Sequence, residues 1–411
     1  MNRTDTLRPV DTAQSILAEP RVRRVLGANM ISMLGSSMAP VALAFAVLGT
    51  GSGIGGLSVV LALNAIPALM FLLLGGVLAD RYSRSRLLVI GRCGAGIAQL
   101  CIAALVLSGT DSTLSLAAAG FISGAAVTIT GPAAQGILRQ VVSVQQLPSV
   151  NAVNRVAGNT IRIAGPVLGG AAAAVVSPGW VLVFDGTTFF LAAAMVLRID
   201  LPHVGKNRAS GAWRSLLDGA AEIRRKTWLL ANIIFGSLLV LCWRVGYQLT
   251  GPAIMADVDG GSARWGFVQG AFGLGMVLGG FVMLRWRPRR LVVVSIAACG
   301  SLAAPLIALA AQCPTVFVVA CSLVAGIGMD IAIICWSTAL GQHISDDMQG
   351  RVFAFTSLGE LSAVPFGYLA IGLAGRDASL FALELVCGVG IIAAVAMNLC
   401  VRSVWSIHRV T

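Results

Sequence analysis

The sequence predicts an all-α integral membrane protein of twelve transmembrane helices, arranged as two pseudo-symmetric six-helix halves. Three observations predict this class: the composition, the number of long apolar runs, and an internal repeat. Of the 411 residues, 57% are hydrophobic and only 11% are charged, whereas charged residues make up about 25% of a typical soluble domain. A chain of this composition is expected to lie in a lipid bilayer.

The apolar runs have the length that a spanning helix needs, which is about 20 predominantly apolar residues. Twelve such runs follow one another, at residues 25–48, 56–79, 87–108, 113–135, 150–176, 179–199, 228–255, 265–284, 291–311, 314–338, 352–374 and 378–401. The polar residues 1–24 lack the pattern of a cleaved signal peptide. We therefore expect the first run to be retained as a spanning helix.

The basic residues predict how these helices are oriented. If the N-terminus is cytoplasmic, 24 of the 29 lysines and arginines, Arg92 among them, fall on the cytoplasmic side, and only Arg264 and Arg376 fall outside. An excess of basic residues on the cytoplasmic side is the usual rule for membrane proteins. We therefore expect both termini in the cytoplasm. Because the basic residues lie in short clusters between apolar runs, nucleic-acid binding is not expected.

The internal repeat divides the chain near its middle. GGVLADRYSRSRLLV at residues 75–89 aligns without gaps on GGFVMLRWRPRRLVV at residues 279–293, an offset of 204 residues. Such repeats are typical of secondary transporters. The predicted divisions are a cytoplasmic tail (1–24), an N-terminal half (25–199), a basic cytoplasmic linker (200–227), a C-terminal half (228–401) and a second cytoplasmic tail (402–411).

No nucleotide, metal or other cofactor is expected. The only Gly-Lys pair, Gly205 and Lys206, lacks the further glycine and the Ser or Thr of a phosphate-binding loop. The nine cysteines include no pair with metal-ligand spacing. With no nucleotide motif, the driving force for any transport is expected to be an ion gradient.

One loop carries a resemblance to a known family. The matching residues are Gly76, Leu78, Asp80, Arg81 and Arg84. They resemble the motif G-x-L-x-D-R-x-G-R between helices 2 and 3 of the major facilitator superfamily, with Ser83 in place of a glycine. Residues 131–170 and 342–372 resemble the bacterial exporter branch that contains enterobactin-exporter-like and macrolide-efflux-like proteins. The resemblance covers the whole chain and implies a secondary active transporter of the bacterial plasma membrane.

A second motif favours export. Gly165, Pro166, Gly169 and Gly170 resemble the core of the family's antiporter motif on helix 5, although Ile161 stands where an upstream glycine is expected. Proline bends a helix, and glycines permit close packing against a neighbour. The alternative is an ordinary glycine-rich contact. Helix 4 has no arginine at the place where related drug antiporters carry one. The proton-coupling role of that arginine therefore cannot be assigned to helix 4 of this chain.

Charged residues within the spans need a partner or a water-filled cavity. Arg244 is followed by Tyr247 and Gln248 at i+3 and i+4, which places all three on one helix face. With Asp330 and Glu360 they form the predicted central site, in which one carboxylate exchanges a proton. The alternative is a static structural pair.

Two further groups of polar residues are expected nearer the membrane surfaces. Asp185 and Glu384 are predicted to lie near the outer face and to be hydrated from outside; the alternative is that either lines the outer vestibule. A stripe in the inner half of helix 5 is predicted to form a cytoplasmic-side network that holds helices together, with contact to the substrate as the alternative. It consists of Asn151, Arg155, Asn159 and Arg162. Asp80, which Leu284 replaces in the second half, suggests a latch toward helix 11 near Arg351.

The function we expect is proton-coupled export of a small amphiphilic organic compound, such as an antibiotic, a siderophore or another secondary metabolite. The expected mechanism is alternating access, for which a monomer suffices. The expected partners are therefore the substrate, protons and the bilayer. Two alternatives remain open: a solute-uptake symporter, and a membrane sensor or enzyme that transports nothing.

Overall fold

The computed structural model describes residues 19–81, 84–109, 112–143, 146–197, 223–374 and 379–409. Within these ranges, side chains are described except at residues 71–81, 84, 131–133, 135–136, 138–140 and 346–347. The predicted tail 1–24 and linker 200–227 lie mostly outside the described residues. Their boundaries, and those of the other predicted divisions, stay predictions.

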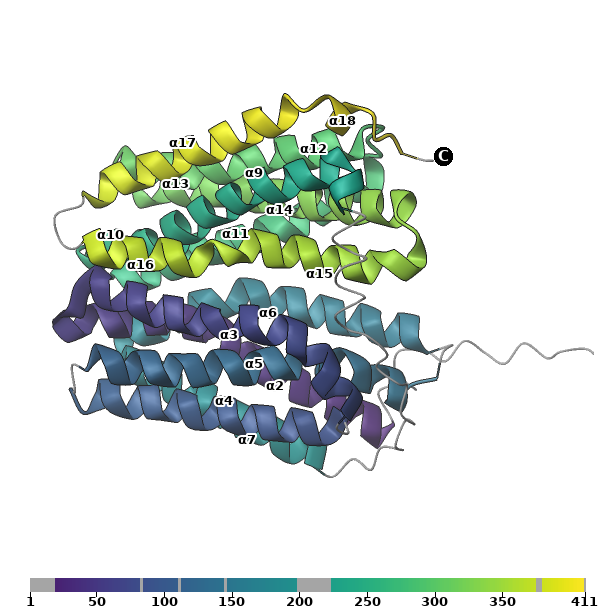
Figure 1. Cartoon of the computed structure of the whole chain (residues 1–411). Coiled ribbons are helices and arrows are strands. Elements are labelled where there is room, and N and C mark those ends of the chain that lie inside the picture. Colours follow the sequence, from purple (N-terminus) through teal and green to yellow (C-terminus); the bar gives the residue numbers. More distant parts are fainter. Residues whose placement is uncertain are drawn as a thin grey trace, which may run out of the picture.

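Six long helices form the first bundle, the lower one in Figure 1. They are α2 (Pro20–Val47), α3 (Gly53–Arg81), α4 (Arg84–Leu107), α5 (Thr113–Val141), α6 (Leu147–Val175) and α7 (Pro178–Leu197). Between α2 and α3 the chain turns back through η1 (Leu48–Ser52), where Gly51 and Gly53 have φ angles of 76° and 58°. Only glycine adopts such angles without strain. We call this bundle the N-half.

The second bundle, the C-half, contains several interrupted helices. Its elements are α9 (Thr227–Trp243), η2 (Arg244–Thr250), α10 (Gly251–Ala256), α11 (Gly261–Arg285), α12 (Leu291–Cys299), η3 (Gly300–Leu302), α13 (Ala303–Ala310), α14 (Thr315–His343), α15 (Asp346–Ser362), α16 (Val364–Ala374), α17 (Leu380–Leu399) and α18 (Arg402–Trp405). The segments α9, η2 and α10 are continuous, and η2 is π-helical. The offset of 204 residues carries α3, α5 and α7 onto α11, α14 and α17 within a few residues.

Ten stretches of the described chain are long and apolar enough to span a membrane. The first of them, residues 20–70, includes both α2 and most of α3, and α6 is not among the ten. The 29 residues of α6 include Asn151, Arg155, Asn159 and Arg162, which lower its hydropathy. The all-α membrane fold is confirmed, and the count of twelve spans stays a prediction.

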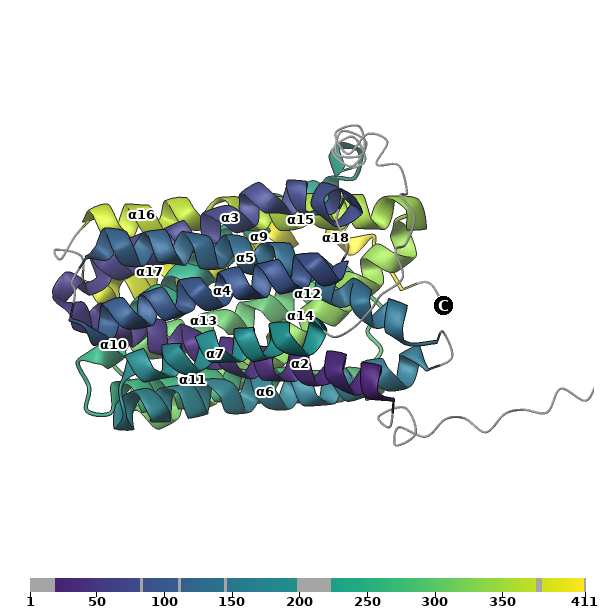
Figure 2. The same cartoon turned by 90° about the horizontal axis from the view of Figure 1, so that it is seen from below.

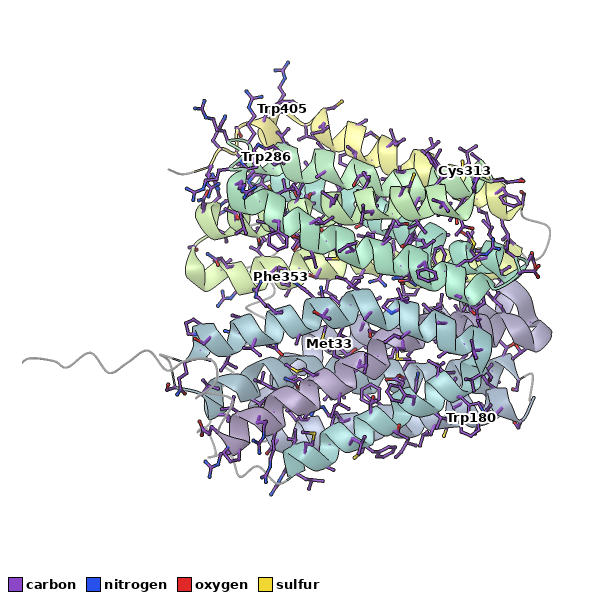
Figure 3. The ribbon with its side chains drawn as sticks, turned by 180° about the vertical axis from the view of Figure 1, so that it is seen from behind. Met33, Trp180, Trp286, Cys313, Phe353 and Trp405 are labelled. Atoms are coloured by element: carbon purple, nitrogen blue, oxygen red, sulfur yellow. The ribbon has the colours of Figure 1, made fainter. Side chains whose placement is uncertain are left out.

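The two ends of the molecule differ in charge. Exposed arginines gather at one end, which we call the basic end: Arg21, Arg23, Arg24, Arg86, Arg285, Arg287, Arg289, Arg290 and Arg402. Asp257, Asp259 and Arg264 are exposed at the opposite end. Figure 3 shows Trp286 and Trp405 at the basic end and Trp180 at the other. Tryptophan is enriched at both surfaces of a membrane protein, as expected if the bundle spans the bilayer along its length.

One basic residue departs from its predicted place on the surface. Arg92 lies inside α4 and is 4% exposed. Its guanidinium donates to the Ala192 carbonyl at 3.1 Å and to Asn29 Oδ1 at 2.6 Å. Arg92 therefore joins α4 to α7 and α2, because a buried guanidinium needs acceptors.

Candidate functional site

A cavity of about 520 Å³ lies between the halves. In the N-half it is lined by Ser36, Ala39, Pro40, Leu43, Ala44, Leu61, Asn64, Ala65, Ala68, Gln99, Ile102, Ser123, Gly124, Val127, Thr128, Asp185 and Phe189. In the C-half it is lined by Arg244, Gln248, Pro252, Trp265, Gln269, Leu361, Val364 and Tyr368. Its size is within the usual range for small-molecule sites, which are mostly apolar with a few placed polar groups.

The hydrophobic core shows how the cavity is closed. Toward the opposite end a single cluster of buried residues contains members of both halves, for example Val47 and Leu57 with Leu249 and Leu309. At the basic end the core divides into two clusters. One is confined to the N-half and includes Val22 and Leu88, and the other is confined to the C-half. The halves therefore share a core at the opposite end and have separate cores at the basic end.

Two helix pairs make most of the contact between halves, and Figure 2 shows them along two edges of the molecule: α6 beside α11, and α3 beside α16. In the first pair, the Ser262 hydroxyl donates to the Gly170 carbonyl at 3.2 Å. A Cβ added at Gly266 would lie 2.6 Å from Pro166 O. In the second pair, a Cβ added at Gly372 would lie 3.1 Å from Ser58 Cβ. Both contacts depend on small residues.

The glycines of the predicted antiporter motif face two helices. A Cβ at Gly169 would lie 2.7 Å from the Met38 carbonyl of α2, and Gly165 faces Ser37 of the same helix. Gly170 and Pro166 face α11 instead. The motif thus joins its own half to the other at the end where the core is shared.

Arg244 and Gln248 lie together on the cavity wall. The Arg244 Nη1 atom donates to Gln248 Oε1 at 2.7 Å, and both side chains line the cavity. They belong to the π-helical segment η2, and short π-helical segments often occur at functional sites. The Tyr368 hydroxyl donates to the Arg244 carbonyl at 3.5 Å and joins α16 to this segment.

Tyr247, which was predicted to share this face, does not line the cavity. Its ring is buried and stacks on Trp243, with centroids 4.1 Å apart. Its hydroxyl donates to the Val268 carbonyl of α11 at 3.2 Å. Tyr247 therefore packs η2 against α11, because its side chain leaves the helix on the side of α11.

Asp330 and Glu360 do not meet Arg244, and neither lines the cavity. Asp330 lies on α14 and packs against α11. A Cβ added at Gly279 of α11 would lie 2.9 Å from the Cβ atom of Asp330. Asp330 interacts electrostatically with Arg162 and Arg155 of α6, across the interface between halves. The Glu360 Oε1 atom accepts from Asn232 Nδ2 of α9 at 3.3 Å. In this conformation the predicted central site is therefore three separate places.

Two carboxylates that we expected to be hydrated from outside are buried. Asp185 is 2% exposed and lines the cavity, and its Oδ1 atom has no hydrogen-bond partner. Glu384 is 0% exposed. Its Oε1 atom accepts from the Thr250 hydroxyl at 2.8 Å, while Oε2 has no partner. The expectation was wrong because neighbouring helices cover both residues: Asp185 faces Gly35 of α2, and Glu384 faces Gly246 of η2.

The polar stripe on α6 is exposed. Asn151, Arg155, Asn159 and Arg162 are all accessible to solvent, and no hydrogen bond among these described side chains joins them. The electrostatic interaction of Arg155 and Arg162 with Asp330 is what supports a network between helices. The loop motif Gly76, Asp80, Arg81 and Arg84 lies at the ends of α3 and α4, but its side chains lie outside the described ones. Within the described residues, no group of three metal-ligating side chains is present.

The cavity also contains uncharged polar residues that sequence reasoning missed, chiefly Ser36, Asn64, Gln99 and Gln269. Gln99 is 5% exposed, and Asn64 Nδ2 donates to the Gly120 carbonyl of α5 at 2.9 Å. A search restricted to ionisable residues overlooks them. An amide within a long apolar run is the signal that finds them, because a bilayer disfavours any unpaired polar group.

Comparison with known proteins places this architecture. The family model described as "Major Facilitator Superfamily" matches residues 25–368. The enterobactin exporter EntS of Shigella flexneri is 26% identical over 226 residues, which cover 54% of this chain and 52% of that protein. The chain thus spans about half the length of this curated relative.

Solved structures show the same fold over nearly the whole chain. The crystal structure of the nucleoside transporter NupG has a TM-score of 0.74 at 15% identity and covers 92% of this chain and 98% of its own. That of a D-xylose-proton symporter has a TM-score of 0.66 at 14% identity, with coverages of 92% and 96%. With the family model matched across both halves, this multi-pass membrane protein is a transporter rather than an enzyme, and it belongs to the Major Facilitator Superfamily.

Proposed function

We propose that the protein exports a small amphiphilic organic compound across the bacterial plasma membrane by alternating access, driven by a proton gradient. The observation that carries this proposal is the core, which both halves share at the opposite end and which divides at the basic end. A cavity closed on one side by contacts between small residues corresponds to one of the two states that alternating access needs.

The basic end is assigned to the cytoplasm. The exposed arginines at this end support the assignment, since basic residues are enriched on the cytoplasmic side. Both termini are then cytoplasmic, and the cavity in this conformation faces the cytoplasm. An exporter takes up its substrate from that side.

The chemistry of the cavity supports an amphiphilic substrate. Its walls include Leu43, Ile102, Phe189 and Trp265, with amides and hydroxyls between them. Apolar walls bind a ligand by burying its apolar surface, while the few polar groups fix the orientation of the ligand. The name of the curated relative supports export, and the antiporter-like glycines at the contact between halves agree with it.

Uptake is the second candidate, because the same fold occurs in a D-xylose-proton symporter. The coupling carboxylate is proposed to be Asp330 or Glu360. Asp330 interacts electrostatically with Arg162 and Arg155 of the other half, so protonation of its carboxylate would weaken an attraction between the halves.

Transport in inside-out vesicles tests the proposal. A panel of fluorescent amphiphiles with positive, negative and zwitterionic charge serves as the probe. Acidifying the vesicle interior should drive accumulation of at least one probe, and a protonophore should abolish it. If accumulation needs the gradient of opposite sign, the protein is an uptake system. No accumulation under either gradient would contradict both transport functions.

A further inference from the structure

Two charged residues line the central cavity, and they have opposite signs. Asp185 comes from α7 of the N-half, and Arg244 comes from η2 of the C-half. All other described side chains that line the cavity are uncharged at neutral pH.

Neither charge is neutralised by the other. Asp185 lies seven residues from the start of α7, about 10 Å along the helix from the opposite end. Arg244 lies twelve residues from the end of α10, about 18 Å from the same end. The two therefore lie at different depths on walls from different halves. No ion pair joins them in the described structure.

Each group also retains unused hydrogen-bonding capacity. The Oδ1 atom of Asp185 is buried without a partner, although Ser36 of α2 lies within hydrogen-bonding reach of the carboxyl. The guanidinium of Arg244 has five N–H donors, and Gln248 is the side-chain acceptor that it contacts among the described residues. A buried charge without a partner is costly in a protein interior, and this cost applies to Asp185, whereas Arg244 is half-buried and has Gln248 as an acceptor. A ligand cation would remove the cost at Asp185, and a ligand anion would accept from the remaining N–H donors of Arg244.

We propose that the ligand of this cavity is an amphiphilic zwitterion. Its ammonium group binds Asp185, its carboxylate or other oxyanion binds Arg244, and its apolar body lies along the wall that includes Leu43 and Ile102. The cavity volume of about 520 Å³ leaves room for such a body between the two charges. This inference rests on the proposed function, because it identifies the substrate class of the same cavity.

Binding of three related probes to the purified, full-length protein in lipid nanodiscs tests the inference. Nα-dansyl-lysine carries an ammonium, a carboxylate and an apolar ring system. Nα-dansyl-norleucine lacks the ammonium, and the methyl ester of Nα-dansyl-lysine lacks the anion. We expect the wild-type protein to bind the zwitterion at least about tenfold more tightly than either analogue, since charge-assisted contacts in a buried site are strong.

Substitutions should remove the two preferences one at a time. In Asp185→Asn the advantage over the norleucine probe should disappear, while the advantage over the ester persists. In Arg244→Gln the pattern should reverse. Asp257→Asn and Arg264→Gln, which change exposed charges at the opposite end, serve as matched controls and should change neither preference.

The probes alone decide the matter even if a variant fails to fold. Equal affinity of the wild-type protein for all three compounds, including no measurable affinity for any, overturns the inference. The inference is also overturned if Asp185→Asn loses the preference over the ester, or if Arg244→Gln loses the preference over the norleucine probe. Because binding needs no gradient, charge-selective binding without gradient-driven accumulation would support the zwitterion and refute transport. Gradient-driven accumulation of probes without charge preference would support transport and refute the zwitterion.

Discussion

Gly266→Ala adds one methyl group where α11 crosses α6 at the closed end of the cavity. The new Cβ would lie 2.6 Å from Pro166 O and 3.2 Å from the Cα atom of Gly170. Both neighbours are backbone atoms, so no side chain can move aside. The helices must separate by at least about 0.4 Å to bring the closer contact to 3.0 Å, the shortest that real Cβ atoms make.

Overpacking of this kind costs about 1–3 kcal/mol, and it acts only on the conformation in which α6 and α11 are in contact. The equilibrium should therefore move away from the conformation described above by about 5- to 150-fold. Gly266 does not itself line the cavity, so the added methyl group makes no contact with a ligand bound there. The predicted effect is on the balance of states.

Accessibility of Phe353 measures this balance. Phe353 lies on α15 toward the basic end, is 60% exposed, and faces the N-half in Figure 3. We expect maleimide labelling of Phe353→Cys to slow in Gly266→Ala, in a background with the exposed Cys101 and Cys400 changed to serine. Gly341→Ala is the matched control, because an added Cβ there meets nothing within 4 Å. Equal labelling rates in the two variants would refute the reasoning.

Other predictions concern the buried carboxylates. Asp330→Asn or Glu360→Gln should abolish proton-driven export while the protein stays folded and inserted; full transport by both variants would exclude them as coupling residues. Glu384→Leu should lower the Tm of the purified protein, because it removes the hydrogen bond between α17 and η2 and leaves the buried Thr250 hydroxyl only carbonyls of its own helix, such as that of Gly246, whereas Glu384→Gln keeps an acceptor on α17. A net hydrogen bond contributes about 0.5–1.5 kcal/mol, and equal Tm values for the two Glu384 variants would show that the bond does not stabilise the fold.

The fold was predictable from the sequence because it depends on patterns that act locally. The length of the apolar runs set the helices, and the offset of 204 residues related the halves. The pairing of Arg244 with Gln248 was also within reach, since it joins residues four apart on one helix. These features need no knowledge of which helices are neighbours.

The site was less predictable because it depends on neighbours. Asp185 near a helix start looks exposed, but α2 covers it. Tyr247 is three residues from Arg244, yet it packs on α11 rather than in the cavity. Asp330 and Glu360 share an apolar environment in sequence, but they face α11 and α9 respectively. The direction in which each helix faces is set by packing across the bundle, which spacing along one chain does not specify.

Distances between the halves at both ends test the central claim most directly. Spin labels at Arg86 and Phe353 report the basic end, and labels at Val175 and Val316, which are 84% and 82% exposed, report the opposite end. Both pairs are measured in liposomes with and without an imposed proton gradient. We predict that the gradient shortens the distance at the basic end and lengthens the distance at the opposite end. Two distances that change in the same direction, or that both stay constant, would contradict alternating access between these halves.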